Sequence, residues 1–269
     1  MCAIDCPAPF PPRPGISHVI FDFDGTLSWL RHGWPGLMAA LFRPYYPGRP
    51  GETEEGIRDL LLSEILSRNG NPTIFQMIRF QEIVRERGGD CPEPEELRQM
   101  YQGQLDDLIS ERSKLIRSGR ARQDDFVVHG GRAFLEKLRR RGLGLIILSG
   151  TIEHRVREEA ELLGLADYFG RHIYGSGAKE FSKKLVVDRL LAEEAISGSQ
   201  LLSLGDGPVE IHETKNVGGL AVAVASDEEI NGSGKPDPWK RRQLLRAGAD
   251  VVVADFSPAD ELLEMIFGG

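Results

Sequence analysis

Hydrophobic residues recur along this chain with two different periods, which separate a strand–helix part from an all-helical part. The first apolar run, ISHVIFDF at residues 16–23, is rich in β-branched and aromatic residues and predicts a strand. From residue 126 onward, similar runs alternate with single amphipathic helices. This alternation predicts right-handed crossovers and a mostly parallel sheet. The expected fold class is therefore α/β, with a doubly wound, Rossmann-like sheet.

The elements expected in this part follow from the same pattern. After the strand at 16–23, strands are expected at 126–130, 143–148, 172–174, 201–204, 220–225 and 250–253. Helices are expected between them, at 132–141, 152–163, 183–195, after Pro208, at 239–246 and at 258–267.

Residues 29–125 show helical spacing of apolar positions and no strand pattern. The helices expected there are 36–42, 54–68, 72–87 and 95–117. We therefore expect an all-helical domain at 29–125, inserted into an α/β core made of residues 16–28 and 126–269. Residues 1–15 are expected to form a flexible, Pro-rich N-terminus.

The composition of the chain argues against several classes of protein, including nucleic-acid binders, disulfide-rich proteins and membrane proteins. The chain has 269 residues and a formal net charge of −8, which argues against binding to duplex nucleic acid. Its cysteines, Cys2, Cys6 and Cys91, are odd in number and match no zinc spacing, so free thiols in a reducing compartment are expected. No apolar stretch reaches about 18 residues, and the N-terminus lacks a signal-peptide pattern. We expect a cytoplasmic protein, a monomer or homodimer, that does not bind membranes.

Two aspartates end the first strand, in the sequence FDFDGTLS at residues 21–28. Asp22 and Asp24 are two residues apart, so they point to the same side while the strand geometry persists. Two carboxylates held so close repel each other unless a positive charge lies between them. A divalent metal ion is the simplest candidate for that charge.

Other polar groups follow strands or begin helices farther along the chain. Ser149-Gly150 follows the strand at 143–148, Gly205-Asp206 with Glu210 follows the strand at 201–204, and Lys183 begins a helix. Taken singly, each is more typical of a turn, a helix cap or a solvated side chain. Because the carboxyl ends of parallel strands share one edge of a sheet, their joint occurrence predicts a single site.

These residues make the chain similar to the haloacid dehalogenase superfamily of phosphotransferases. Its first motif, DxDGT, is matched by Asp22 to Thr26, and its second by Ser149. Its third is a lysine at the start of a helix, matched by Lys183, and its acidic fourth is matched by Asp206 with Glu210.

The resemblance implies a role for each of these residues. Asp22 would attack phosphorus to form an aspartyl-phosphate, and Asp24 would act as the general acid and base. Asp22, Asp206 and the backbone carbonyl of Asp24 would bind Mg²⁺. Glu210 would hold a metal-bound water or brace Lys183. The groups expected to hold the substrate's phosphoryl oxygens are Ser149, Lys183, Thr26 and the backbone at Gly150.

The choice of Lys183 over Lys179 and Lys184 follows from helical phase. Counted from Lys183, Val187 and Leu190 fall at i+4 and i+7, so this lysine lies in line with an apolar face.

The helical insert lies where the C1-type cap occurs in this superfamily. The resemblance therefore implies a Mg²⁺-dependent phosphatase. Its substrate would be a small phosphorylated metabolite, such as a sugar phosphate or a phosphoglycolate-like compound. A phosphomutase and a non-catalytic binding module stay open as alternatives.

In the segment after the first motif, Arg31 and Arg43 lie among aromatic residues and are candidates for binding the leaving group. The segment Asn231–Arg242 is interpreted as a surface loop leading into a helix, or as a loop that reaches the site or a partner subunit.

Overall fold

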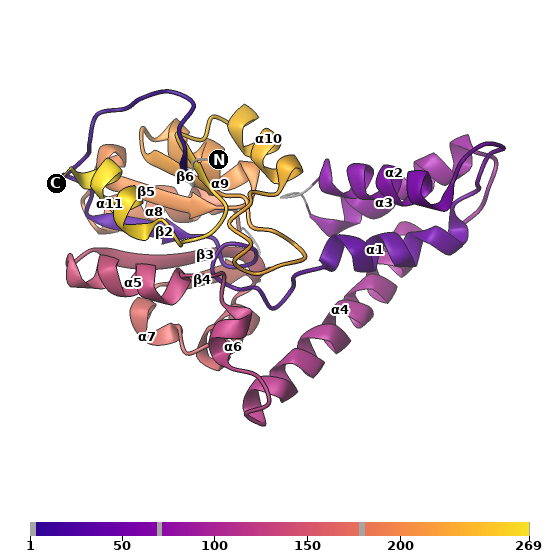
Figure 1. The fold of residues 1–269 in the computed structure, drawn as a ribbon, viewed down its shortest axis with the longest axis horizontal. Coiled ribbons are helices and arrows are strands. Elements are labelled where there is room, and N and C mark those ends of the chain that lie inside the picture. The colour runs from indigo at the N-terminus through magenta and orange to yellow at the C-terminus, as the bar shows by residue number, and fades with distance from the viewer. Residues whose placement is uncertain (1–3, 69–71, 178–180, 269) are drawn as a thin grey trace. The chain divides into compact units, whose positions relative to one another are not determined.

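The computed structural model describes residues 4–68, 72–177 and 181–268. The chain forms two compact units, one made of residues 1–30 and 115–269 and the other of residues 31–114. The first is an α/β unit and the second is helical (Figure 1). The expected insert, 29–125, is therefore longer than the helical unit, because residues 115–125 group with the α/β unit.

A seven-stranded sheet forms the centre of the α/β unit, in the order β1-β7-β6-β5-β2-β3-β4. All neighbouring strands are parallel except β1, which runs antiparallel to β7. This confirms the doubly wound α/β class expected from the alternation of strands and helices. The strands are β1 (Ile4–Asp5), β2 (His18–Phe21), β3 (Gly144–Ile152), β4 (Ile173–Ser176), β5 (Leu201–Gly205), β6 (Leu220–Val224) and β7 (Val251–Val253).

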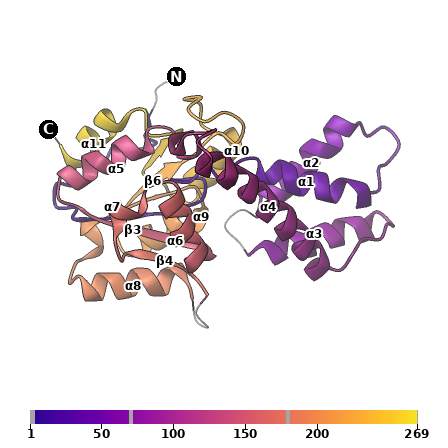
Figure 2. The same ribbon diagram turned by 90° about the horizontal axis from the view of Figure 1, so that it is seen from below.

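Helices cover both faces of this sheet (Figure 1, Figure 2). Helices that pack on one face are α5 (Gly131–Arg140), α6 (Glu153–Leu162), α7 (Ala166–Phe169) and α11 (Ala259–Phe267). Helices that pack on the other are α8 (Lys183–Glu193), α9 (Pro208–Asn216) and α10 (Pro238–Arg246). Strand residues alternate between the two faces, as Phe21 and Ile20 of β2 do.

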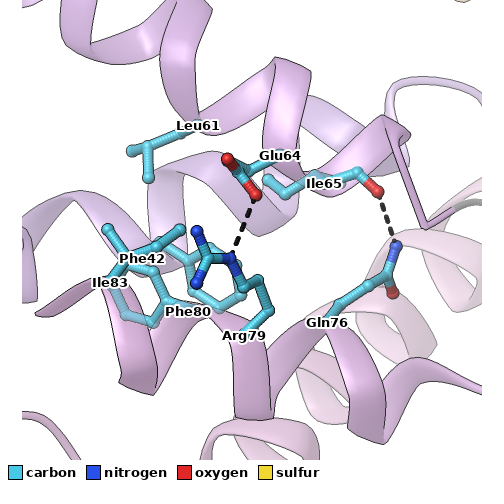
Figure 3. A pocket seen from close by; sticks show the side chains of 8 residues that line it. All are labelled: Phe42, Leu61, Glu64, Ile65, Gln76, Arg79, Phe80 and Ile83. Carbon is cyan, nitrogen blue, oxygen red and sulfur yellow. Dashed lines mark hydrogen bonds and ion pairs between the residues drawn. The ribbon is translucent and has the colours of Figure 1, made fainter.

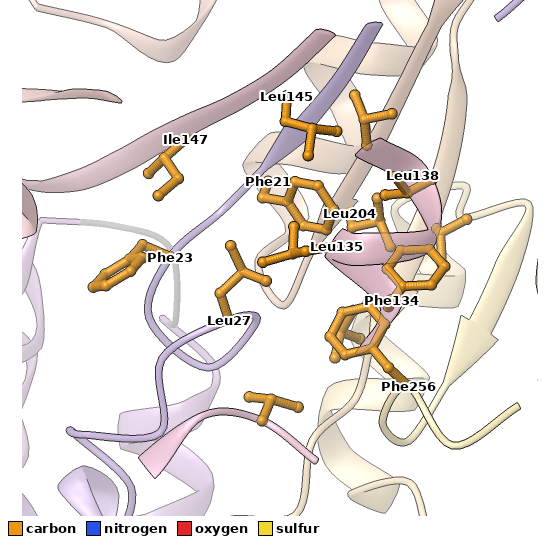
Figure 4. Packing of buried hydrophobic residues seen from close by; sticks show 14 of the residues in the cluster. Phe21, Phe23, Leu27, Phe134, Leu135, Leu138, Leu145, Ile147, Leu204 and Phe256 are labelled. Carbon is orange, nitrogen blue, oxygen red and sulfur yellow. The ribbon is translucent and has the colours of Figure 1, made fainter. Parts of the chain in front are cut away.

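Phenylalanine rings pack among aliphatic side chains in the core between the sheet and the face covered by α5 and α11 (Figure 4). The rings of Phe134 and Phe256 stack with centroids 4.9 Å apart, and Phe21 meets Phe134 edge to face. Phe23, which lies between the two aspartates of the first motif, is fully buried in the same core. Its burial anchors the loop that carries both aspartates to the sheet.

The helical unit contains α1 (Trp34–Phe42), α2 (Glu54–Leu66), α3 (Thr73–Glu86) and most of α4 (Pro94–Arg117). Helix α2 begins where the Thr53 hydroxyl accepts a hydrogen bond from the Gly56 N–H at 3.1 Å, as an N-cap should. Stacked rings of Phe42 and Phe80 join α1 to α3, with centroids 3.9 Å apart. Figure 3 shows a small hollow beside these rings, with room for no more than about one water molecule.

The two segments that connect the helical insert to the sheet lie side by side. The Trp29 N–H donates to the Phe126 carbonyl at 2.8 Å, and the Val128 N–H donates to the Leu27 carbonyl at 2.9 Å. Asn231 adds a third segment, because its side chain donates to the Val127 carbonyl at 2.7 Å.

Several expectations about local structure were wrong. Residues 4–5, expected to belong to a flexible terminus, form edge strand β1, and Asp5 pairs with Arg241 of α10. Residues 126–130 form no strand, because only a single bridge from Val127 to Ser28 is made there. Helix α7 was not expected.

Two further observations bear on the expectations drawn from composition. Cys6 and Cys91 are free thiols, whereas Cys2 lies outside the described residues. In the part of the chain that the structure describes, no helix is long and apolar enough to span a membrane.

Candidate active site

The site lies at the ends of β2 and β5 and beside the last residues of β3. Strand β2 is between β3 and β5, and Phe21 at its end is in register with Ile147 and Leu204. The residues that follow these positions therefore emerge side by side at the carboxyl edge of the sheet. They bring together the groups expected from the sequence, beginning with Asp22, Ser149 and Asp206.

A tight turn follows Asp22 and brings the first motif against the fourth. Gly25 has a φ of 76°, and its N–H donates to the Ser28 carbonyl at 2.9 Å. A Cβ atom at this position would lie 2.2 Å from Oδ2 of Asp206. Both the left-handed backbone and this close approach require glycine, which explains why it follows Asp24.

Asp24 is held by a residue that the sequence analysis did not assign. The hydroxyl group of Thr151 donates to Oδ2 of Asp24 at 2.8 Å. The Thr151 N–H in turn donates to the Ser149 hydroxyl at 3.1 Å, and Ser149 is almost fully buried. The second motif therefore contacts the second aspartate of the first motif through Thr151.

Lys183 lies in the position expected from helical phase. It is the first residue of α8, after the N-cap Ser182, and its Nζ donates to Oδ1 of Asp22 at 2.6 Å. The same ammonium group forms an ion pair with Glu210. Lys184, in contrast, pairs with Asp188 on the exposed side of the helix, and Lys179 lies outside the described residues.

Glu210 reaches the site from the first turn of α9. Its Oε2 atom is buried and has no hydrogen-bond partner among the described residues, although Oε1 pairs with Lys183. A Cβ atom on Gly207 would lie 2.5 Å from Oε2, so the loop before α9 leaves space for this side chain. The hydroxyl group of Thr26 is also buried, with no partner in the described part of the chain.

A second buried lysine, which the sequence analysis did not identify as part of the site, lies next to Asp206. Lys240 of α10 is 1% exposed, and its Nζ is 3.1 Å from Oδ2 of Asp206 and 2.5 Å from Oε1 of Glu228. It also donates to the Ser226 hydroxyl at 3.1 Å, which itself donates to the Gly25 carbonyl at 2.7 Å. The segment Asn231–Arg242 is thus a loop leading into a helix, and the helix carries a lysine into the site.

Burial controls the ionisation of the acidic groups. It raises the pKa of Asp22, and the ammonium group of Lys183 offsets this shift only in part. Burial also raises the pKa of Asp206 to about 6, despite the neighbouring Lys240. For Lys240, burial alone would lower the pKa, but the carboxylates of Glu228 and Asp206 outweigh burial and raise it. Burial therefore favours the protonated form of both aspartates more than water does.

A model of a known protein family matches most of this chain. A family model described as haloacid dehalogenase-like hydrolase matches residues 16–218. The chain belongs to the haloacid dehalogenase-like hydrolases. Comparison with curated proteins finds no match.

Solved structures with the same fold include other haloacid dehalogenase-like proteins. A conserved haloacid dehalogenase-like protein of Agrobacterium tumefaciens has a TM-score of 0.64 at 18% identity, covering 92% of this chain and 97% of its own. A predicted phosphoglycolate phosphatase of Haemophilus somnus has a TM-score of 0.61 at 15% identity, covering 92% and 98%. A family hydrolase of Deinococcus radiodurans, solved with bound phosphate and sodium, has a TM-score of 0.61 at 15% identity, covering 95% and 100%.

Hydrolases of the haloacid dehalogenase-like family generally use a divalent metal ion, and the residues of this site fit one. The two lysines occupy Oδ1 of Asp22 and Oδ2 of Asp206, so each carboxylate keeps a second oxygen. The buried Oε2 atom of Glu210 has no hydrogen-bond partner among the described residues, and four carboxylates contact only two lysines here. No three acidic, histidine or cysteine side chains among the described residues converge as a metal cluster. The resemblance implies only two carboxylate ligands, with a backbone carbonyl as the third, so a cluster of three such side chains is not expected.

We expect the metal-free Asp206→Asn variant to be more stable than the wild type at about pH 7.5 and equally stable at about pH 3. The pKa of Asp206 is raised from 3.8 to about 6, so the folded protein binds this proton more tightly than the unfolded chain does. The stability from this proton is complete below pH 3.8 and is lost as the pH rises to about 6. Thermal unfolding in a chelator across this range measures the difference, and a difference independent of pH would contradict the assignment.

The two arginines expected to bind the leaving group have different surroundings in the helical unit. Arg43 is engaged by Glu54, with Nε donating to Oε2 at 2.8 Å and a second contact to Oε1. Arg31 is half-buried. Of the aromatic residues near them, Tyr46 packs into the core of the helical unit, with the guanidinium group of Arg87 4.3 Å from its ring centre.

Proposed function

We propose that this protein is a Mg²⁺-dependent phosphatase that hydrolyses a small phosphomonoester through an aspartyl-phosphate on Asp22. The contact that carries the proposal is the 2.6 Å hydrogen bond from Lys183 to Asp22, two residues before an aspartate held by Thr151. A carboxylate approaches a phosphate dianion only when nearby cations neutralise the repulsion. Lys183 provides one such cation beside the attacking oxygen.

The proposed reaction has two steps, in which the two aspartates of the first motif have different roles. An oxygen of Asp22 forms a bond to phosphorus, the bond to the leaving oxygen breaks, and Asp24 in its acid form donates a proton to that oxygen. Asp24 then takes a proton from the water that attacks phosphorus, the bond to Asp22 breaks, and inorganic phosphate leaves. The bond from Thr151 fixes the direction in which Asp24 exchanges protons.

The remaining groups would bind the phosphoryl oxygens and the metal. Ser149, the backbone at Gly150, Lys183 and the buried hydroxyl group of Thr26 would hold phosphoryl oxygens. Asp22, Asp206 and the Asp24 carbonyl would bind Mg²⁺, which lowers the charge repulsion at phosphorus when bound. Glu210 already contacts Lys183, which supports its bracing role over the alternative of holding a metal-bound water.

Phosphate release from a panel of phosphorylated metabolites, measured with Mg²⁺ and with a chelator, tests this proposal. A phosphatase releases inorganic phosphate from one or more compounds only when the metal is present. Interconversion of sugar phosphates without release would instead indicate a mutase. No reaction with any compound, in a protein that binds Mg²⁺, would favour a binding module.

We further propose that the helical unit selects the leaving group, because the site groups described above act only on the phosphoryl group and the metal. We expect Arg31→Ala and Arg43→Ala to lower kcat/KM at least about tenfold for the best metabolite and to spare a generic aryl phosphate.

Arg98→Ala is the matched control for Arg43→Ala, because Arg98 forms a similar two-bond ion pair with Glu95 on the surface of the helical unit. It should leave kcat/KM unchanged for both compounds. Equal losses for both compounds in the Arg43→Ala variant would show that the pair with Glu54 stabilises the unit and does not read the substrate.

A further inference from the structure

Lys240 is the most deeply buried charged group of the site, and the proposed reaction assigns it no step. We infer that it is a positioning residue, which balances the charge of Asp206 and holds this carboxylate in place before a divalent cation binds. The inference rests on the proposed function, because it takes Asp206 as a metal ligand.

The hydrogen bonds of Lys240 link three parts of the site. Its ammonium group contacts Asp206 after β5, and it reaches Glu228 and Ser226 in the loop after β6. Ser226 continues the connection to the Gly25 carbonyl in the turn after the nucleophile. All three donor positions of the ammonium group are therefore used, and each partner lies on a segment that borders the site.

The two lysines divide the acidic groups between them. Lys183 contacts Asp22 and Glu210, whereas Lys240 contacts Asp206 and Glu228. A buried carboxylate without a cation is strongly unfavourable. Lys240 thus allows the half of the site that contains Asp206 to fold without a metal ion.

The same position makes Lys240 a competitor of the metal. Its charge lies 3.1 Å from Oδ2 of Asp206, so it opposes a divalent cation bound to the other oxygen. Glu228 offsets this opposition, since it adds a negative charge 2.5 Å from the same ammonium group. Removing the lysine should therefore weaken the metal-free fold and strengthen metal binding.

The test uses the full chain with Mg²⁺ as the probe. Thermal unfolding is measured in a chelator and in excess Mg²⁺ for the wild type and for Lys240→Met, and calorimetry gives the Mg²⁺ affinity. We expect Lys240→Met to lower the metal-free Tm by roughly 10 °C. We expect it to bind Mg²⁺ at least about tenfold more tightly, so that Mg²⁺ raises its Tm by about 4 °C more than that of the wild type.

Arg241→Met provides the matched control. Arg241 is the next residue of the same helix, and it is ion-paired with Asp5 of β1, whereas the lysine pairs with acids of the site. This variant should lower the Tm by no more than about 3 °C and should leave the Mg²⁺ affinity unchanged.

Glu228→Gln keeps the inference testable if Lys240→Met does not fold. It removes negative charge while retaining the lysine, so it should bind Mg²⁺ more weakly than the wild type. A general loss of stability would not change metal affinity in opposite directions in the two variants.

Two results would count against the inference. A wild-type Mg²⁺ affinity in both variants would show that Lys240 is only a buried structural ion pair. A wild type that neither binds Mg²⁺ nor releases phosphate would contradict the proposed function itself, and the inference would fail with it.

Discussion

Asp22→Asn is expected to reduce phosphate release by a factor on the order of 10⁴ or more while the protein stays folded. Asparagine has nearly the same shape as aspartate, but its amide cannot form the aspartyl-phosphate. The variant should be at least as stable as the wild type, because burial raises the pKa of Asp22 and makes its ionised form unfavourable in the fold. Lys183 keeps Glu210 as an ion-pair partner. Phosphate release and thermal unfolding on the same preparation measure both effects.

Asp260→Asn is a suitable control for this substitution. Asp260 has an 87% exposed side chain and pairs with Lys137 on α5, outside the acidic cluster. Its variant should retain full activity. Wild-type phosphate release by a folded Asp22→Asn protein would contradict the covalent mechanism, whatever the metal requirement.

The second large effect is expected from Lys183→Ala, which should lower kcat by a factor on the order of 10² to 10³. The variant removes the ammonium group that lies 2.6 Å from Oδ1 of Asp22, so in the proposed reaction the charge of the transferring phosphoryl group would no longer be balanced on that side. Activity should be measured at saturating Mg²⁺, and thermal unfolding should be measured in parallel.

Lys184→Ala separates the role of this position from that of the helix. Lys184 is the next residue of α8, and its partner is Asp188 on the exposed face. Its removal should leave kcat within about twofold of the wild type, because exposed ion pairs contribute little. If Lys184→Ala lost activity and Lys183→Ala did not, the geometry around Asp22 would not describe the working enzyme.

Elements with a clear period could be predicted from the sequence, and those without one could not. Helix α8 and the long helix α4 were placed to within a few residues, because their apolar positions recur over several turns. Strand β1 has only two residues and precedes a proline-rich stretch, so no alternation marks it. Phe126, Val127 and Val128 gave residues 126–130 an apolar start because they pack into the core of the α/β unit, yet only a single bridge, from Val127 to Ser28, forms there.

Site residues, too, could be predicted only where the sequence around them has a clear pattern. Lys183 was chosen because Val187 and Leu190 lie in phase with it, and the structure places it beside Asp22. Lys240 has the same relation to Leu244 of α10 and to Ala247, which follows the helix, and both are buried. This signal was present, but a polar, glycine-rich segment precedes the helix and suggested a surface loop. A lysine in phase with the buried face of a short helix can thus belong to a site even when no motif marks it.

The two hydrogen-bonded segments that connect the helical insert to the sheet have a consequence for the evolution of this chain. Leu27 and Trp29 hydrogen-bond to Val128 and Phe126, so about a hundred residues are inserted at one point without separating the flanking segments. The entropy of closing such an insertion grows only slowly with its length. Recombination at this junction can therefore replace the helical unit with another, larger or smaller, while the α/β unit keeps its sheet register. Under the proposed role of the helical unit in selecting the leaving group, selection can then change the substrate and the chemistry independently.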